Sequence, residues 1–103
     1  MAEHVVEFHP LAREEALAAY DWYADRDQAA AAAFQTELEN ARMAICRSPE
    51  IWMPYVLNTR RYLLKQFPFA IIYRVTHQRI EIIAVAHQRR RPRYWTNRTQ
   101  DTN

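Results

Sequence analysis

The stretch Phe69–His87, FAIIYRVTHQRIEIIAVAH, decides the fold. Two runs rich in β-branched residues, Phe69–Val75 and Arg79–His87, are separated only by Thr76–Gln78. Such residues favour strands, and so short a link joins antiparallel neighbours. Both alternating faces of the second run are apolar, one with Ile80, Ile82, Ala84 and Ala86, the other with Ile83 and Val85. This run is therefore predicted to be a central strand, covered on both faces.

A third strand is predicted immediately before this pair. The run Arg60–Gln66 has strand character, and Pro68 separates it from the next run. Proline cannot donate to a strand ladder, so it marks the connection between two strands. Ser48–Pro49 ends the helix that precedes this strand. The segment between them, Glu50–Thr59, contains Pro54, and we expect it to be a loop.

The N-terminal half predicts one strand and a helical hairpin. Val5–Phe8 has strand composition, and His9–Pro10 ends it. Helices are expected over Leu11–Asp25 and from the capping residue Asp27 to about Arg47. Their apolar stripes are Ala12, Ala16, Ala19 and Tyr23 in the first helix, and Phe34, Leu38, Ala41 and Ile45 in the second. The fold class is therefore α+β: an N-terminal strand at the sheet edge and a helical hairpin packed on a small antiparallel sheet.

Length and composition limit the function classes. The 103 residues suit a single domain, expected over residues 1–98 with a frayed tail at Thr99–Asn103. The chain has no glycine, which argues against a phosphate-binding glycine loop or a Rossmann turn, and we expect no cofactor. Cys46 is the only cysteine and no histidine has metal-ligand spacing, so no metal is expected. No apolar run is long enough for a membrane span, and a reducing cytoplasm is the default location.

Charge is divided unevenly along the chain. Residues 1–50 carry ten acids and four arginines, a net charge of −6, and residues 51–103 carry ten bases and two acids, a net charge of +8. Thirteen of the fourteen bases are arginine, the residue suited to bidentate contact with phosphate or carboxylate. The basic half indicates an anionic partner, either nucleic acid or an acidic protein segment. The alternative is that the two halves neutralise each other within the fold.

Basic residues of the sheet half are the candidate binding residues. A target or partner protein would be bound by Arg60, Arg61, Lys65, Arg89, Arg90, Arg91, Arg93 and Arg98. In a meander these residues can converge at one edge and bind phosphates. The alternative is a solvated cluster that protects the strand ends from aggregation.

The segment AVAHQRRRPRYW, Ala84–Trp95, also allows a catalytic cluster. His87, Tyr94 and Arg74 are the candidates for acid, base and cation in metal-independent RNA cleavage. His87 could equally be a structural residue at a strand end, and Tyr94 could stack on bases or pack. We expect Trp95 to fold back and cover the core.

In combination, several stretches resemble the RelE/ParE superfamily, the toxins of bacterial type II toxin–antitoxin modules. The resemblance extends from Val5 to Arg98. It rests on Trp22-Tyr23, on FPFAIIYRV and IEIIAVAH, and on the ending His87-x-x-Arg90-x-Pro92-x-Tyr94-Trp95-x-x-Arg98. It implies the fold derived above and a cognate antitoxin whose C-terminal segment wraps the toxin. An acidic segment would suit the basic half.

The superfamily divides by activity. RelE-like members cleave mRNA in the ribosomal A site, whereas ParE-like members poison DNA gyrase and are not nucleases. The RelE-like pattern has a phosphate-clamping arginine where this chain has Ala70, and it has several lysines where this chain has only Lys65. The resemblance is therefore more ParE-like than RelE-like.

Three hypotheses follow from the resemblance. The first is a non-enzymatic toxin that poisons gyrase. The second is a ribosome-dependent mRNA endonuclease with His87 or Tyr94 as acid or base and Arg61, Arg74 and Arg90 as clamps. The third is a non-toxic module that still binds an antitoxin. A homodimer and a toxin–antitoxin hetero-oligomer are both compatible with the sequence, and a membrane partner is not expected.

Overall fold

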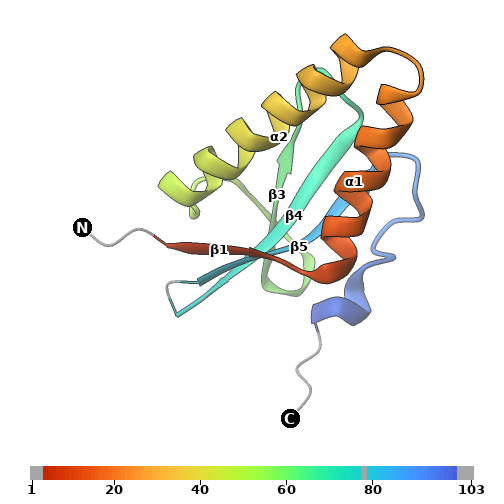
Figure 1. Ribbon diagram of the computed structural model, residues 1–103. Helices are drawn as coiled ribbons and strands as arrows, with labels where there is room; N and C mark the ends of the chain where they lie inside the picture. Colours follow the sequence, from red (N-terminus) through yellow and green to blue (C-terminus); the bar gives the residue numbers. More distant parts are fainter. Residues whose placement is uncertain (1–3, 78, 100–103) are drawn as a thin grey trace.

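The computed structural model describes residues 4–77 and 79–99 of the chain (Figure 1). Its helices and strands are β1 (Val5–Phe8), α1 (Pro10–Ala24), α2 (Gln28–Arg47), β2 (Met53–Tyr55), β3 (Thr59–Leu63), β4 (Phe69–Thr76) and β5 (Arg79–His87), with short 3-10 turns η1 (Val56–Asn58) and η2 (Thr96–Thr99). No helix in this part of the chain is both long and apolar enough to cross a membrane.

The strands form one sheet in the order β1-β5-β4-β3-β2. The meander β2–β5 is antiparallel, and β1 joins the edge beside β5 in parallel orientation. The helices α1 and α2 lie together across one face of the sheet (Figure 1). The predicted α+β class, the helical hairpin and the edge position of β1 are confirmed. Strand β5 lies between β1 and β4, as predicted for an interior strand, although β1 flanks only Arg79–Ile82. The predicted antiparallel sheet is mixed, because β1 runs parallel to β5.

Local capping sets the start of each helix. The His9 side chain accepts a hydrogen bond from the Leu11 backbone at 3.0 Å, and Pro10 occupies the first turn, where its missing N–H costs nothing. Asp27 caps α2 by accepting from the Ala29 backbone at 2.9 Å. The predicted stripe of α2 is buried against the sheet: Phe34, Leu38, Ala41 and Ile45.

A bulge in β5 interrupts the alternation of its two faces that was predicted from the sequence. The pairing shifts between Ile72 and Tyr73 of β4, which leaves Ile83 of β5 without a partner in the ladder. Ile83 and Ala84 therefore both pack on the face away from the helices, and Val85 returns to the helix face. The prediction that Ile83 and Val85 share a face was wrong, because one extra residue reverses the alternation.

Two boundaries also differ from prediction. Strand β3 ends at Leu63 rather than Gln66, because the Glu37 carboxylate of α2 accepts hydrogen bonds from the backbone N–H groups of Lys65 and Gln66. The predicted loop contains an edge strand, β2, which tolerates Pro54 because an edge strand has one unpaired side.

The sheet face away from the helices has its own small core. Trp95 covers it and is only 2% exposed, so its predicted core-covering role is confirmed. The residues packed around it come from three strands and the C-terminal segment: Ala70, Ile72, Ile83, Ala84, Tyr55, Val56, Ala86 and Tyr94. Thr99, predicted to begin a frayed tail, belongs to η2 and donates a 2.8 Å hydrogen bond to the Thr96 carbonyl. The rest of that tail lies outside the described residues.

Candidate functional site

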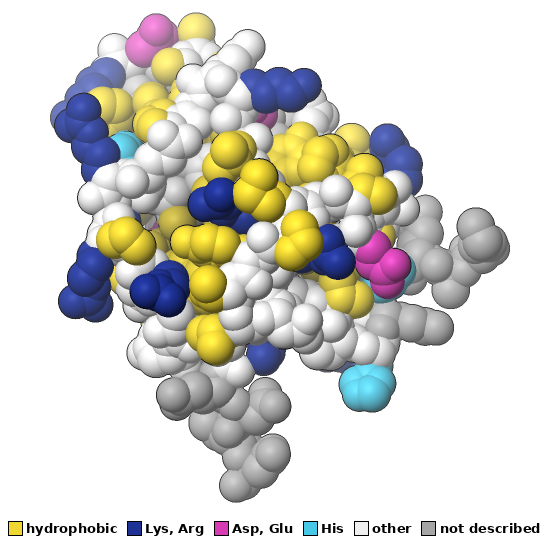
Figure 2. Space-filling view, turned by 180° about the vertical axis from the view of Figure 1, so that it is seen from behind, with side chains coloured by type: hydrophobic (Ala, Val, Ile, Leu, Met, Phe, Trp, Pro, Cys, Tyr) yellow, Lys and Arg dark blue, Asp and Glu magenta, His cyan; other side chains and the backbone are white. Residues whose placement is uncertain are grey.

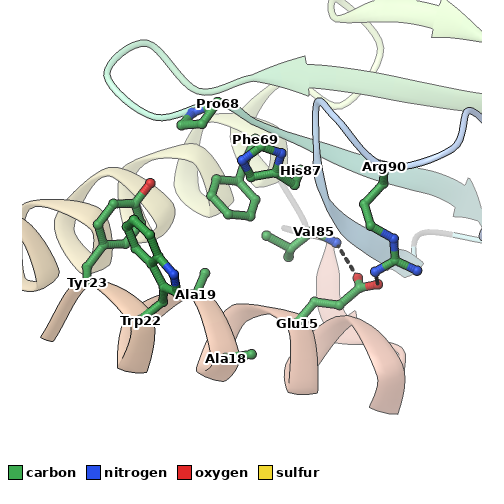
Figure 3. A pocket seen from close by; sticks show the side chains of 10 residues that line it. All are labelled: Glu15, Ala18, Ala19, Trp22, Tyr23, Pro68, Phe69, Val85, His87 and Arg90. Atoms are coloured by element: carbon green, nitrogen blue, oxygen red, sulfur yellow. Dashed lines mark hydrogen bonds and ion pairs between the residues drawn. The ribbon is translucent and has the colours of Figure 1, made fainter. Parts of the chain in front are cut away.

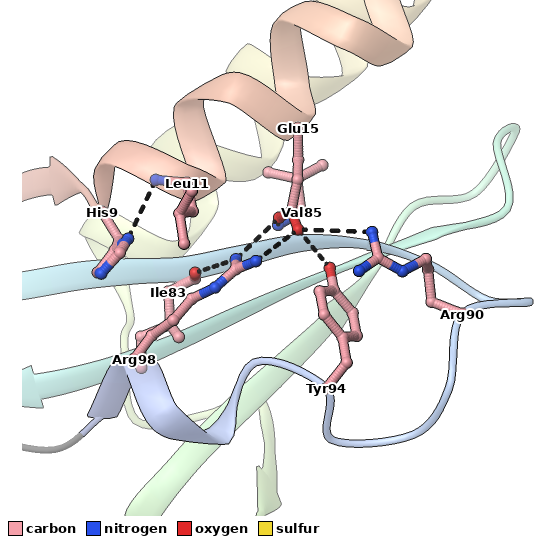
Figure 4. A network of polar contacts seen from close by, with 8 residues as sticks. All are labelled: His9, Leu11, Glu15, Ile83, Val85, Arg90, Tyr94 and Arg98. Carbon is pink, nitrogen blue, oxygen red and sulfur yellow. Dashed lines mark hydrogen bonds and ion pairs between the residues drawn. The ribbon is translucent and has the colours of Figure 1, made fainter.

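The carboxylate of Glu15, on α1, is the centre of a partly buried polar network (Figure 4). Its side chain is 15% exposed. One oxygen accepts from the Val85 backbone N–H at 2.9 Å and from Arg98 at 3.1 Å. The other accepts from the Tyr94 hydroxyl at 2.7 Å and from Arg98 at 2.9 Å. Glu15 thereby joins a helix, the central strand and the C-terminal segment.

This network occupies the open half of the outer edge of β5. Strand β1 pairs only with Arg79–Ile82, so beyond Ile82 this edge has no neighbouring strand among the described residues. Backbone groups there need other partners. The Ile83 carbonyl accepts from Arg98 at 3.1 Å, and the Val85 N–H donates to Glu15. The ion pair replaces the strand that is missing.

Tyr94 is held in its protonated form by this arrangement. Burial raises the pKa of its phenol, and so does donation of its hydroxyl to Glu15. The guanidinium of Arg90 lies over the Tyr94 ring, 3.8 Å from its centroid, and 4.0 Å from the Glu15 carboxylate. The Tyr94 hydroxyl therefore donates its proton in a hydrogen bond to Glu15 and is not placed to act as a general base.

A groove with mostly apolar walls runs beside this network, between α1 and the end of β5 (Figure 3). Its volume is about 550 Å³. The walls come from α1, β5 and the start of β4: Glu15, Ala18, Ala19, Trp22, Tyr23, Pro68, Phe69, Val85, His87 and Arg90. Trp22 is 53% exposed, and the Arg26 guanidinium lies 3.7 Å from its ring centroid. We call this the apolar groove.

A second groove, of about 340 Å³, lies on the opposite face of the sheet. Figure 2 shows arginine side chains interspersed with apolar ones on this side of the molecule. The groove is lined by Tyr55, Arg61, Leu63, Ala70, Ile72, Ala86, His87, Gln88, Arg90, Arg91, Pro92, Arg93 and Tyr94. We call it the basic groove. His87 and Arg90 line both grooves.

Comparison with known proteins identifies the family. The family model of the ParE toxin of type II toxin–antitoxin system, parDE, matches residues 6–92. The chain belongs to the ParE toxin family. A solved chain from the chromosomal ParDE TA system of P. aeruginosa is similar, with a TM-score of 0.72 and 17% identity over 82% of this chain and 95% of that one, which shows a shared fold. No curated protein matches the chain.

In this ParE-family toxin only two of the three catalytic candidates share a surface: His87 and Tyr94 both line the basic groove, and Arg74 does not. His87 ends β5, where its Nδ1 accepts from the Arg89 backbone at 3.0 Å. Arg74 pairs with Glu81 at 3.1 Å, near the other end of the strand. Arg74 lies five residue steps along β4 from Phe69, the residue opposite His87, which is about 17 Å at ~3.3 Å per residue. Tyr94 is bound to Glu15.

The candidate binding residues divide into separate places. Four of them line the basic groove: Arg61, Arg90, Arg91 and Arg93. Arg60 instead donates to the Trp52 carbonyl at 2.7 Å, and Arg98 is buried in the Glu15 network at 8% exposure. Lys65 lies by the Glu37-bound turn, and Arg89 is exposed but lines neither groove. Only the first four residues form a common surface.

Glu15 was not among the residues predicted from the sequence. A signal for it exists, since Glu15 lies three residues after Ala12 and four before Ala19, both buried on α1. A glutamate within a buried helical stripe requires a partner. Here the partner is Arg98, whose guanidinium pairs with this carboxylate at 2.9 Å. The described residues contain no group of three or more metal-ligating side chains.

Proposed function

We propose that this ParE-family toxin acts by poisoning DNA gyrase and is neutralised by an antitoxin that binds the apolar groove. The observation that carries the target is that, in a ParE-family chain, His87 and Tyr94 share the basic groove without Arg74, and that the Tyr94 hydroxyl is engaged with Glu15. Acid–base cleavage of RNA needs an acid and a base within hydrogen-bond reach of one reacting phosphate. Here the phenol is engaged with Glu15, and Arg74 is paired with Glu81 about 17 Å along the sheet from the histidine.

Ala70 supports the same conclusion. It lines the basic groove from β4, at the position where the RelE-like pattern has its arginine clamp. A methyl group makes no charge-assisted contact with a phosphate. A toxin that works by binding a protein and stabilising its cleaved-DNA complex does not need that clamp.

Purified gyrase tests the target directly. The toxin should inhibit supercoiling of plasmid DNA and cause cleaved DNA to accumulate at micromolar toxin. The proposal fails if the folded protein leaves supercoiling unchanged while toeprinting on translating ribosomes shows mRNA cleavage. The double variant His87→Ala/Tyr94→Phe should keep its effect on gyrase if it keeps the fold.

The antitoxin is expected to place apolar side chains in the apolar groove. An exposed tryptophan beside a groove of this size is typical of a protein-binding surface. Arg26 and Arg90 stand at its rim, so carboxylates beside the apolar side chains would complement the surface. The partner that fits is an amphipathic acidic segment.

Calorimetry with the product of the neighbouring reading frame tests this. Trp22→Ala should weaken binding by about thirtyfold, the ~2 kcal/mol of a tryptophan hot spot. Leu17→Ala is the matched control, because Leu17 is an exposed apolar residue of α1 that does not line the groove. Equal effects of both substitutions would place the antitoxin elsewhere.

A further inference from the structure

The basic groove has positive charge without compensation at its walls. Four arginines line it, and the described lining residues include no acid. Among the described residues, Arg90 is the one of the four that approaches a carboxylate, that of Glu15, and only at 4.0 Å. Guanidinium groups that converge in this way on a small groove favour an anionic occupant.

Arg61 lies within this groove with unused hydrogen-bonding capacity. Its Nε is buried and has no hydrogen-bond partner among the described residues. Its Nη2 lies 3.1 Å from the Met53 sulfur, a weak acceptor, and its guanidinium stacks over the Tyr55 ring at 4.6 Å. Because the residue is only half-buried and the stack holds its guanidinium in place, a ligand oxygen at the exposed part of the guanidinium, rather than at the buried Nε, would gain a donor that is already positioned.

The loop above the groove holds Arg93 in an unfavourable conformation. Arg93 has a φ of 62°, in the left-handed region that favours glycine. Backbone hydrogen bonds fix the turn around it: Tyr94 N–H to the Arg91 carbonyl at 3.3 Å, and Thr96 N–H to the Arg93 carbonyl at 3.1 Å. Conformations of this kind persist where the surrounding structure requires them, and they are frequent at binding sites.

The floor of the groove favours a nucleic-acid strand over a peptide. It is the face of β3, β4 and β5, and β3 and β4 have neighbouring strands on both sides. The edge of β5 beyond Ile82 has no neighbouring strand among the described residues, but its Ile83 carbonyl and Val85 N–H are bonded to Arg98 and Glu15, so a peptide would have to displace that network to pair with it. The alanines Ala70 and Ala86 leave the floor shallow and apolar, and the stacked pairs Arg61–Tyr55 and Arg90–Tyr94 flank it. A cationic groove with aromatic and apolar walls is the form that single-strand binding sites take.

We propose that the basic groove binds the phosphate backbone of a single-stranded nucleic acid, with Arg61 and Arg93 as phosphate contacts. This site goes beyond the proposed function, and it does not require that gyrase be the target. It assigns one surface to a polynucleotide and leaves the apolar groove to the antitoxin.

Fluorescence anisotropy with the full chain tests the site. The probes are fluorescein-labelled 20-nucleotide oligo(dT) and oligo(rU), titrated at several KCl concentrations. Binding should weaken as salt increases, with a slope of log K against log[salt] of about −0.7 for each phosphate contact. Arg61→Gln and Arg93→Gln should each weaken binding several-fold and reduce the slope by about 0.7. A preference between the probes identifies DNA or RNA as the source of the strand, and either supports the site.

The control is Arg79→Gln, which makes the same charge change outside the groove. Arg79 is exposed at the start of β5 and pairs with Glu7 at 3.2 Å. The oligonucleotide affinity and the salt slope of the Arg79→Gln variant should stay close to those of the unaltered protein. Equal losses in all three variants would mean that net charge alone is responsible and would overturn the proposal. Absence of oligonucleotide binding at low salt would also overturn it. So would an Arg61→Gln variant that loses affinity for the antitoxin but keeps its affinity for the oligonucleotides. Gyrase inhibition is measured separately, so failure of either proposal leaves the other testable.

Discussion

At the scale of residues, one carboxylate determines how the C-terminal segment is held. Glu15, on α1, accepts hydrogen bonds from the strand β5 and from the segment that contains Tyr94 and Arg98. Arg98 is almost fully buried, and its charge is balanced by this carboxylate. Removal of one partner of a buried pair leaves the other as an uncompensated charge.

Glu15→Gln should therefore destabilise the fold by about 3 kcal/mol, because it leaves Arg98 charged and buried. Urea unfolding followed by circular dichroism measures the loss. Glu14→Gln is the matched control, since Glu14 is the exposed neighbour on the same helix, and it should change the free energy of unfolding little. Equal effects of the two substitutions would contradict the central role of Glu15.

Tyr73 gives a prediction about alkaline pH. Its ring is fully buried and its hydroxyl donates to the Pro49 carbonyl at 2.6 Å. Burial raises the pKa of Tyr73 from 10.0 to about 12. The unfolded chain then loses its phenol proton before the folded chain does, so the free energy of unfolding should fall as pH rises from 10 towards 12.

Tyr73→Phe separates the two contributions. At pH 7 it should cost about 1 kcal/mol through the lost hydrogen bond. Above pH 10 the unfolding free energy of the variant should decline less steeply than that of the parent. Urea unfolding at pH 7, 9 and 11 provides the comparison, and parallel declines would show that Tyr73 does not titrate in this range.

At the scale of elements, the chain folds its tight connections without glycine. Four non-glycine residues have positive φ among those described: Leu57, Asn58, His77 and Arg93. Asparagine adopts this conformation at little steric cost, whereas leucine adopts it at a higher one. Leu57, in the turn between β2 and β3, has φ 58° and ψ 38° and a side chain that is mostly exposed.

Leu57→Gly should therefore stabilise the protein, by about 1 kcal/mol, because it removes the left-handed penalty of a residue with a Cβ. Leu57→Ala is the matched control, which removes most of the same exposed side chain but keeps the Cβ. Thermal unfolding should show a higher Tm for the glycine variant than for the alanine variant. The reverse order would mean that the leucine side chain stabilises the turn.

The elements predicted from sequence are those with a local cause. The helices carry their caps, His9-Pro10 and Asp27, within the chain segment itself, and the long apolar runs of β4 and β5 resemble strands in any context. The bulge at Ile83 and the edge strand β2 have no such local cause. Each depends on how a neighbouring strand pairs, which periodicity does not encode.

At the scale of the whole molecule, the two grooves lie on opposite faces of the sheet and share a wall. His87 and Arg90 line both. Arg90 is held by its stack on Tyr94 and by its approach to Glu15. A ligand that attracts this guanidinium into one groove withdraws it from the other, so occupation of the two sites should be coupled.

We expect antitoxin binding to lower the affinity of the basic groove for a single strand. The preformed toxin–antitoxin complex should bind oligo(dT) roughly tenfold more weakly than the toxin alone, and the oligonucleotide should weaken antitoxin binding by the same factor. Anisotropy and calorimetry measure the two directions. With Arg90→Gln the coupling should shrink. An unchanged oligonucleotide affinity in the toxin–antitoxin complex would show that the two grooves bind their ligands independently.

The sequence by itself determined the fold class, the helical hairpin, the central strand, the basic half and the family resemblance. All but the last depend on local composition and periodicity, which a chain carries wherever it is placed, whereas the resemblance depends on the motifs quoted from Trp22 to Arg98. Only the tertiary structure decided which arginines act together. Residues as separate as Glu15 and Arg98 meet because the open edge of β5 leaves backbone groups that need partners. The AVAHQRRRPRYW segment thus contributes to two different surfaces and, through Val85 and Tyr94, to the Glu15 network. Its neighbours in space, rather than its own order, decide what each side chain contacts.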